Sequence, residues 1–440
     1  MTITVRVAPV ASLTLTPGTA DVFVGSVLPL TADARDSANT VLIGRTITWA
    51  TDNAAVASVS GAGVVTGTST GTATITATSE GRTATARVTV STRPLSSIVD
   101  SVRLAWNMPA MGAAIVTLED GLTAVAAAGT RRATGGPAVS TNDLWHIGSN
   151  LKAMTSLLAA VAVSQNRIQW TTTIAQAFPE LSNIRAEYRD VTLRDLLSHQ
   201  SGFRTAPDQT LLGGGTTLPV QRASVAAWAV QQPPAVARGT FLYSNLGYLI
   251  AGAMLDRAFG TSYEAAIAAH VYAPLGVTDA GWGPQAAAGS TAQPVAHTWT
   301  NGSWVVREAH DNPPASAPAG TAHMSLASWG RLVREVLRVE AGTSSVAPAI
   351  VARQTTAAAV AVSATTNYGL GWFITTSSSA NGKLLWHDGT NAGNHSLAVV
   401  DPLRNVALLV TTNGFDPGGR SWNAMNALIG RLETFHTTGR

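Results

Sequence analysis

Residues 72–90, TATITATSEGRTATARVTV, alternate between polar and small or apolar side chains with a period of two. Such alternation is typical of a β-strand that buries one of its faces. The alternation is interrupted at Glu80-Gly81-Arg82, where the glycine is a turn signal. The pattern therefore predicts two antiparallel strands joined as a hairpin, and it restricts this part of the chain to a β fold.

Further short strands are predicted around this hairpin. The stretch RTITWAT (45–51) has strand character, and its Trp49 is a natural core residue for a small sandwich. The stretch GAGVVTGTSTG (61–71) supplies turn glycines. Several short strands separated by regularly spaced turn signals predict a β-sandwich of about 90 residues, close in size to an immunoglobulin domain.

The same region resembles the bacterial Ig-like group 2 family over residues 8–90. The resemblance is carried by VGSVLPLTADARD (24–36), RTITWATDNAAVASVSGAGVVTG (45–67) and GTATITATSEG (71–81). It implies an accessory domain of the kind common on exported or surface proteins. We therefore expect this domain to contact a cell surface or a polysaccharide and to carry no catalytic chemistry.

The composition changes sharply near residue 91, and STRPLS (91–96) is a plausible linker. Strand-like runs occur both early and late in the rest of the chain, with helices and Gly/Pro-rich loops over about 165–345 between them. This order predicts an α/β domain in which the terminal segments share one antiparallel sheet and the middle is a helical subdomain. The predicted boundaries are 1–91 for the Ig-like sandwich and 96–440 for the second domain.

Composition argues against several function classes. A net charge of +3 over 440 residues without a basic run does not favour nucleic acid or an anionic membrane as a partner. The absence of cysteine excludes disulfides and thiolate chemistry. We expect no metal or other cofactor, because the histidines are scattered and no glycine-rich nucleotide loop follows a strand. The longest apolar helix candidate, about 157–163, is too short to span a bilayer.

The start of the chain bears on its location. MTITVRVAPV lacks the charged and long apolar segments of a signal peptide. This leaves either a cytoplasmic protein or the mature part of an exported one. The Ig-like resemblance favours the second alternative, and we expect a secreted, periplasmic or cell-surface location.

The stretch HIGSNLKAMT (146–155) places Ser149 three residues before Lys152, and the only other lysine is Lys383. Unlike arginine, a buried lysine can lose its proton and act as a base. Residues at i and i+3 share a helix face, so the amine can reach the hydroxyl. The alternative is that Ser149 caps a helix and that Lys152 is a stray charge, although a cation near a helix N-terminus is unfavourable.

Two later motifs favour the catalytic alternative: Tyr243-Ser244-Asn245 and His387-Asp388-Gly389-Thr390. Together with Ser-x-x-Lys, their order and context resemble the serine β-lactamase and penicillin-binding-protein-like hydrolases over about 96–438. The relevant branch contains class C β-lactamases, DD-peptidases and family VIII esterases. The surrounding sequence also matches, for example in VTLRDLLSHQSGF (191–203) and YGLGWF (368–373).

The resemblance implies roles for the motif residues. Ser149 is the expected nucleophile, and Lys152 and Tyr243 share the general-base work, with the proton acceptor left open between them. Asn245 is expected to orient Lys152 and the substrate. The backbone N–H groups of Ser149 and Thr390 are the expected oxyanion hole, and we expect Gly389 to let the acyl group approach the strand closely.

The third motif bears on the substrate, because His387-Asp388-Gly389 replaces the usual Lys/His-Thr-Gly of penicillin-recognising members. A largely neutral His387 and an Asp388 that faced the cleft would disfavour a free substrate carboxylate. We therefore expect an esterase that acts on a small ester. The alternatives are a D-amino-acid amidase or aminopeptidase, a DD-peptidase or β-lactamase, and a non-catalytic surface-binding protein.

For the other aromatic and histidine residues near these motifs, the sequence indicates a role less specifically. Trp145, Trp372 and Trp386 are predicted either to line an apolar acyl pocket or to belong to the core. His199 is expected to be structural.

Overall fold

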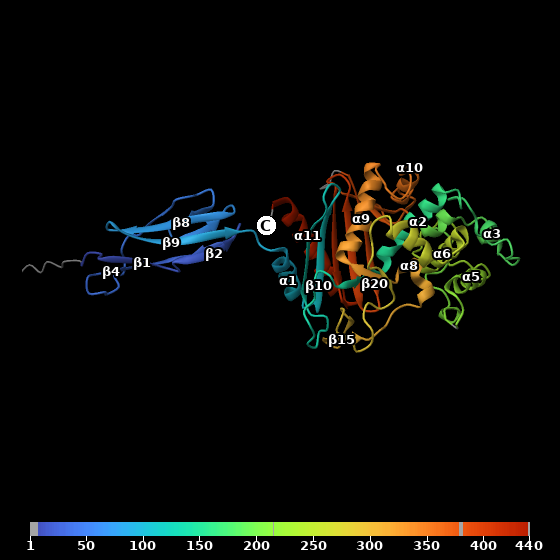
Figure 1. The fold of residues 1–440 in the computed structure, drawn as a ribbon, viewed down its shortest axis with the longest axis horizontal. Helices are drawn as coiled ribbons and strands as arrows, with labels where there is room; N and C mark the ends of the chain where they lie inside the picture. Colours follow the sequence, from blue (N-terminus) through green and yellow to red (C-terminus); the bar gives the residue numbers. More distant parts are fainter. Residues whose placement is uncertain (1–7, 214, 378–381, 439–440) are drawn as a thin grey trace, which may run out of the picture. The chain divides into compact units, whose positions relative to one another are not determined.

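The computed structural model describes residues 8–213, 215–377 and 382–438. The chain divides into two compact units, one of residues 1–97 with 434–440 and one of residues 98–433. Each unit is described by itself, and both are drawn in Figure 1.

The first unit consists of short strands in three small sheets, with the orders β2-β9-β8-β5, β3-β7-β6 and β1-β4. The strands are β1 (Ser12–Thr16), β2 (Thr19–Phe23), β3 (Val27–Pro29), β4 (Thr31–Arg35), β5 (Thr48–Thr51), β6 (Ala57–Val59), β7 (Val64–Gly67), β8 (Gly71–Ser79) and β9 (Arg82–Ser91). This arrangement confirms the predicted all-β, Ig-like region.

The predicted hairpin is formed by β8 and β9. Ser79 pairs with Arg82, so Glu80 and Gly81 alone form the turn, and both have positive φ, 48° and 80°. Positive φ at both central residues is the requirement of a type I′ turn, which matches the twist of the flanking strands. The alternation also has its predicted result, because Ile75 and Val88 are buried in the unit's core, with Trp49 packed against it.

The second unit is built on an eight-stranded antiparallel sheet with the order β11-β10-β22-β21-β20-β19-β18-β17. Early strands therefore pair with late ones, as predicted. The sheet strands are β10 (Ala110–Thr117), β11 (Gly121–Gly129), β17 (Val360–Ala361), β18 (Thr366–Tyr368), β19 (Phe373–Ser377), β20 (Gly382–Asn391), β21 (Asn394–Asp401) and β22 (Val406–Thr412). Short strands outside it are β12 (Leu144–His146), β13 (Gly281–Trp282), β14 (Ala296–Thr300), β15 (Ser303–Arg307), β16 (Ala322–Ser325) and β23 (Gly414–Phe415).

Helices cover both faces of this sheet (Figure 1): α1 and α11 lie on one side, and α9, α2 and the helical subdomain lie on the other. The helices are α1 (Leu95–Ala105), α2 (Leu151–Ser164), α3 (Ile174–Ala177), α4 (Leu193–Leu197), α5 (Leu218–Ala229), α6 (Asn245–Phe259), α7 (Tyr263–Ile267), α8 (Ala317–Gly320), α9 (Leu326–Ala341), α10 (Ala349–Ala352) and α11 (Arg420–Thr438). The α/β architecture expected for the second domain is thereby confirmed.

Helix α2 lies at the centre of this unit. Its residues from Leu151 to Ala162 are all buried, as expected of a helix that is apolar on every face. Ser149 and Lys152 were expected to lie on one helix, but residues 148–150 form a 3₁₀ turn and the α-helix begins at Leu151. Among the described residues, no helix combines the length and apolar character that a membrane span requires.

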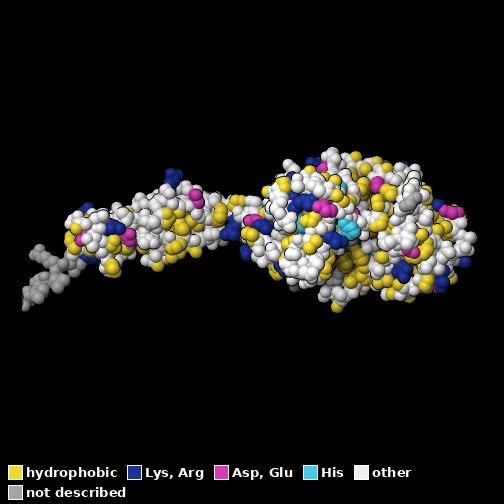
Figure 2. Space-filling model, turned by 90° about the horizontal axis from the view of Figure 1, so that it is seen from below, with side chains coloured by type: hydrophobic (Ala, Val, Ile, Leu, Met, Phe, Trp, Pro, Cys, Tyr) yellow, Lys and Arg dark blue, Asp and Glu magenta, His cyan; other side chains and the backbone are white. Residues whose placement is uncertain are grey.

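The surface of the molecule carries a mixture of charges. On the face drawn in Figure 2, basic side chains are scattered and interleaved with acidic ones among polar and apolar groups. This mixture accords with the small net charge of the chain.

Candidate active site

Ser149 lies in the 3₁₀ turn (Gly148–Asn150) that joins β12 to α2. Gly148 has a φ of 51°, and a Cβ atom on it would lie only 2.7 Å from the carbonyl carbon of Gly389. A Cβ atom on Gly389 would lie 2.1 Å from the carbonyl oxygen of Ile147. Two glycines thus let the turn that carries Ser149 pack directly against β20.

This packing corrects the expected role of Gly389. We predicted that its missing side chain would make room for an acyl group. Instead, the backbone of the nucleophile turn fills that space, with the Ser149 nitrogen 2.7 Å from where the Cβ would be. Glycine is required there because two backbone segments meet at van der Waals distance.

The amine of Lys152 is hydrogen-bonded to the hydroxyl of Ser149. Lys152 Nζ lies 2.8 Å from Ser149 Oγ and donates a second hydrogen bond of 2.6 Å to the carbonyl oxygen of Ala319. The N-cap of α2 is Asn150 and not Ser149. The alternative that Ser149 is a helix cap beside a stray charge is therefore wrong.

The environment of Lys152 favours its neutral form. The side chain is fully buried, and this burial lowers the pKa of the amine to about 7, against a smaller opposing effect of the Asp388 charge. Burial disfavours the charged form because a low-dielectric interior solvates an ammonium poorly. A large fraction of Lys152 is therefore neutral near pH 7 and able to accept a proton.

Tyr243 approaches the same two residues. Its ring centroid lies 5.0 Å from Lys152 Nζ. Burial raises the pKa of Tyr243, and the neighbouring Ser149 hydroxyl opposes that effect only in part. The phenol therefore keeps its proton near neutral pH, and it can donate or relay a proton but does not act as a phenolate.

A cavity of about 140 Å³ opens beside Ser149. Asn245, which is exposed at the first turn of α6, and Thr390 on β20 both face this cavity. The cavity is lined by Ser149, Ala206, Pro207, Gln209, Asn245, Leu249, Asn312, Ser316, Ala319, Gly320 and Thr390. All of these side chains are uncharged. The position of Asn245 suits contact with a substrate, whereas the hydrogen bonds of Lys152 go to Ser149 and Ala319 and not to Asn245.

The two predicted oxyanion donors belong to backbone segments in direct contact. A Cβ atom on Gly148 would lie 3.0 Å from the backbone nitrogen of Thr390, and one on Gly389 would lie 2.7 Å from that of Ser149. Both N–H groups are therefore supplied where the turn packs on β20. Backbone donors held in this way need no rearrangement to bind a developing oxyanion.

His387 is buried and uncharged at neutral pH. Its Nε2 lies 3.1 Å from the hydroxyl of Tyr368, and its Nδ1 lies 2.6 Å from the carbonyl oxygen of Asp388. Burial lowers the pKa of His387 to about 4, although the Asp388 charge opposes this. No cation is therefore available at position 387 to receive a substrate carboxylate.

The condition that Asp388 faces the cleft is not met, because its carboxylate lies near His395. Adjacent strand residues point to opposite faces of a sheet, and Asp388 Oδ2 lies 3.5 Å from Nε2 of His395. The other ring nitrogen of His395 is bonded to Ser421 Oγ of α11 at 2.9 Å. Asp388 is thus held on the α11 side of the sheet.

None of the three tryptophans considered as an acyl pocket lines the cavity beside Ser149. Trp145 and Trp372 are buried in the main hydrophobic cluster. Trp386 stacks on Phe373 and contacts Trp422 of α11. The core interpretation therefore holds for Trp145 and Trp372, and Trp386 is a half-buried residue of an aromatic cluster outside the cavity.

His199 is structural, as expected. It is buried with a φ of 61°, and its Nδ1 accepts a hydrogen bond of 3.0 Å from the backbone N–H of Ser244. Its ring centroid lies 4.3 Å from that of Tyr243. Burial holds the pKa of His199 well below its usual value, so a neutral ring positions the loop that carries Tyr243.

Sequence reasoning missed a buried polar network behind the nucleophile turn. His146 Nδ1 accepts a hydrogen bond of 3.0 Å from the backbone N–H of Gly148, and its Nε2 lies 3.0 Å from Asp311 Oδ2. The acceptor role of Nδ1 places the proton on Nε2, where it is donated to Asp311. Asn391 bonds both Asp311 and the carbonyl oxygen of Gly320. The sequence places His146 only three residues before Ser149, but no motif indicated that Asp311 or Asn391 would lie beside it.

A second missed contact fixes the turn to β21. Ser396 Oγ donates a hydrogen bond of 2.8 Å to the carbonyl oxygen of Ile147 and accepts one of 2.9 Å from Asn150 Nδ2.

The described residues contain no group of three or more acidic or histidine side chains placed to hold a metal ion.

Comparisons with known proteins match the two regions of the chain to two families. Residues 106–430 match the Beta-lactamase family model, and residues 9–90 match that of the bacterial Ig-like domain (group 2). A relative named penicillin-binding protein 4, from Amycolatopsis lactamdurans, is 30% identical over 180 residues, which are 40% of this chain and 46% of the relative. A relative named unguisins hydrolase, from Aspergillus violaceofuscus, is 25% identical over 39% of this chain and 31% of the relative. The chain thus spans less than half the length of these relatives.

Solved structures share the fold. A penicillin-binding protein homologue from Pyrococcus abyssi has a TM-score of 0.62 at 18% identity, covering 76% of this chain and 77% of that one. A D-amino acid amidase from Ochrobactrum anthropi has a TM-score of 0.61 at 16% identity, covering 78% of this chain and 98% of that one. The ordered motifs, the sheet and the match over residues 106–430 lead to one conclusion: the chain belongs to the β-lactamase family of serine hydrolases and carries a bacterial Ig-like domain before the hydrolase domain.

Proposed function

We propose that this protein hydrolyses small uncharged carboxylic esters through an acyl-enzyme on Ser149. The proposal rests on the uncharged lining of the cavity beside Ser149, where a substrate would bind. The side chains that line the cavity beside Ser149 are all uncharged, and burial keeps His387 neutral. A substrate carboxylate would lose its hydration there without gaining a cationic partner, which is costly.

In the proposed acylation step, neutral Lys152 takes the hydroxyl proton of Ser149 as Oγ forms a bond to the ester carbonyl carbon. The carbonyl π electrons move to oxygen, and the N–H groups of Ser149 and Thr390 stabilise this oxyanion. The C–O bond to the leaving group then breaks. The alkoxide receives the Lys152 proton, which Tyr243 relays, and the alcohol departs.

In the proposed deacylation step, a water molecule attacks the acyl carbon while Lys152 takes one of its protons. The second tetrahedral intermediate collapses, the carboxylic acid leaves, and Ser149 Oγ regains a proton from Lys152. The assignment of the base to Lys152 is supported by its pKa of about 7 and by the burial that raises the pKa of Tyr243. A base whose pKa is near the working pH is the most effective proton acceptor.

The deciding experiment compares hydrolysis of p-nitrophenyl butyrate by the wild type, Ser149→Ala and the matched control Ser224→Ala. Ser224 is exposed on α5 and bonds only the carbonyl oxygen of Val220 in its own helix. We expect turnover by the wild type and the control, and a loss of at least about 10³-fold in Ser149→Ala. Circular dichroism checks that all three proteins are folded.

Intact mass spectrometry distinguishes the remaining alternatives. An acyl adduct on the wild type that is missing from Ser149→Ala supports the acyl-enzyme. Turnover of D-alanine p-nitroanilide without turnover of the ester would replace the esterase proposal with the amidase alternative. Lack of any adduct and of any turnover would favour a non-catalytic binding protein.

The Ig-like domain belongs to the same proposal as a targeting module. Its family is supported by the match over residues 9–90. We propose that it contacts a cell surface or polysaccharide and that the enzyme acts outside the cytoplasm. Co-sedimentation of the full chain with cell-wall polysaccharide, compared with residues 96–440 expressed alone, tests this role.

A further inference from the structure

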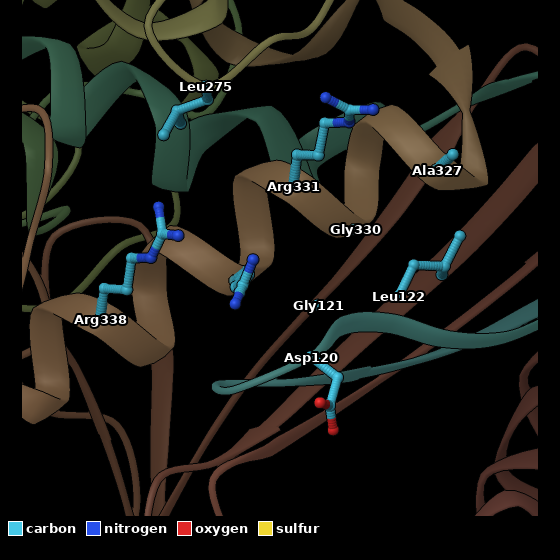
Figure 3. Close-up of a pocket in the computed structure, with 9 residues that line it drawn as sticks. Asp120, Gly121, Leu122, Leu275, Ala327, Gly330, Arg331 and Arg338 are labelled. Atoms are coloured by element: carbon cyan, nitrogen blue, oxygen red, sulfur yellow. The ribbon is translucent and has the colours of Figure 1, made fainter.

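A cavity in the described part of the chain lies away from Ser149 and is bordered by three arginines. Its volume is about 360 Å³, and it is bordered by α9, by the β10–β11 turn and by Leu275. Arg331, Arg334 and Arg338 contribute to it from α9. Their spacing of three and four residues places them on one face of the helix, and Figure 3 shows Arg331 and Arg338 extending toward the side on which Leu275 lies.

This cavity is separate from the candidate active site. Thr390 is paired with His395, which pairs with Thr412, which in turn pairs with Met111 at the start of β10. The turn at the cavity follows Thr117 at the other end of β10. Six residues of extended strand therefore place the Thr117 end of β10, at the cavity, about 20 Å from the Met111 end, which is level with Thr390.

The arginines are held in place but keep free donors. Arg334 donates from Nε to the carbonyl oxygen of Leu118 at 2.9 Å and from an Nη atom to that of Glu119. Three of its five N–H groups therefore stay available. Arg331 is exposed, and its side chain makes no hydrogen bond or ion pair with the described residues. Its Nη1 lies over Gly276, where a Cβ atom would come within 2.6 Å.

Arginines outnumber carboxylates at this cavity. Arg338 is partly neutralised by the buried Glu335, 3.5 Å away, whereas Arg331 and Arg334 have no carboxylate partner among the described residues. Asp120 also borders the cavity, but Figure 3 shows its carboxylate turned away from Arg331 and Arg338. A phosphate monoester carries about −1.5 to −2 charges at pH 7 and three acceptor oxygens, so it can bond two guanidinium groups at once more fully than a carboxylate with two oxygens can.

We propose that this cavity is a binding site for a small phosphate monoester. The guanidinium groups of Arg331 and Arg334 bind the phosphate, because planar forks of N–H donors match its oxygens. The organic part of the ligand packs on Leu122 and Leu275, which border the same cavity. A volume of this size is in the range of small-molecule sites. The proposal does not depend on the chemistry at Ser149.

The test is isothermal titration calorimetry at low ionic strength with phenyl phosphate, inorganic phosphate and benzoate. The variant Arg331→Gln removes the guanidinium without breaking a hydrogen bond of the fold. Arg431→Gln removes another exposed arginine, on α11 and outside the cavity, and is the matched control. We expect one site that binds phenyl phosphate more tightly than inorganic phosphate and much more tightly than benzoate. Loss of one charge-assisted contact should weaken it about tenfold or more in Arg331→Gln.

Two results would overturn the proposal. One is equal affinity for phenyl phosphate in wild type, Arg331→Gln and Arg431→Gln. The other is failure of the wild type to bind phenyl phosphate at all. Arg331→Glu, which reverses the charge at an exposed position, should abolish binding while urea unfolding shows the fold intact. Because the readout is binding and not turnover, failure of the proposed esterase activity leaves this test unaffected.

Discussion

Replacing Lys152 by methionine should stabilise the second unit in a pH-dependent manner. The pKa of Lys152 falls from 10.5 to about 7 in the folded protein because of burial. Between these two values the unfolded chain binds a proton that the folded protein does not, so the free energy of unfolding rises with pH. The full penalty of the buried charge is therefore present below pH 7 and disappears above pH 10.5.

The size of the effect follows from 1.36 kcal/mol per pKa unit. The lysine costs the folded state about 4 kcal/mol at pH 7 and about 2 kcal/mol at pH 9. The variant also leaves the carbonyl oxygen of Ala319 without its donor, which costs about 1–3 kcal/mol at every pH. The stability difference between Lys152→Met and wild type should therefore decrease by about 2 kcal/mol from pH 7 to pH 9.

Urea unfolding followed by tryptophan fluorescence measures this difference. Every tryptophan except Trp49 lies after residue 97, so the signal reports on the second unit. The control is Lys383→Met, which removes a partly exposed lysine paired with Glu340 at 2.8 Å and should change stability by about 1 kcal/mol or less. A stability difference for Lys152→Met that stays constant from pH 7 to pH 9 would refute a depressed lysine pKa.

Three further outcomes are expected. The ester kcat/KM should fall about tenfold per pH unit below pH 7, because Lys152 must be neutral to act as a base; a rate profile flat from pH 5 to pH 7 would contradict this assignment. Gly389→Ala should abolish turnover and destabilise the fold, since its Cβ would meet backbone at 2.1 Å, whereas Gly430→Ala on α11 has open space and serves as the control in both assays. Asp311→Ala should lower kcat and cost about 1–3 kcal/mol of unfolding free energy by removing the carboxylate that accepts from His146; unchanged kcat with lowered stability would make the network purely structural.

Much of the fold was predictable because its signals are local. The β8–β9 hairpin follows from alternation and one turn glycine, and its register agrees with that pattern. The approach of Lys152 to Ser149 follows from helix periodicity, although the turn before α2 is 3₁₀ and not α-helical. Early and late strands do pair in one sheet, as their positions in the chain suggested.

Other features depend on segments that meet only after folding. Ala319 and Asp311 are more than 150 residues from Lys152 and His146, which they contact, and no local pattern marks them. Adjacent residues of β20 point to opposite faces of the sheet, so His387 contacts Tyr368 while Asp388 lies near His395. Which face holds the cavity was decided by the helices packed on the sheet.

The amino-acid sequence by itself determined the β-rich N-terminal region, the order of the three motifs and the pairing of a serine with a lysine one helical turn away. These follow from the short-range periodicity of strands and helices. The tertiary structure decided why position 389 must be glycine, which donors surround Ser149 and how far burial lowers the pKa of Lys152. Those properties arise from close packing and desolvation, which depend on every segment that the fold brings around the site.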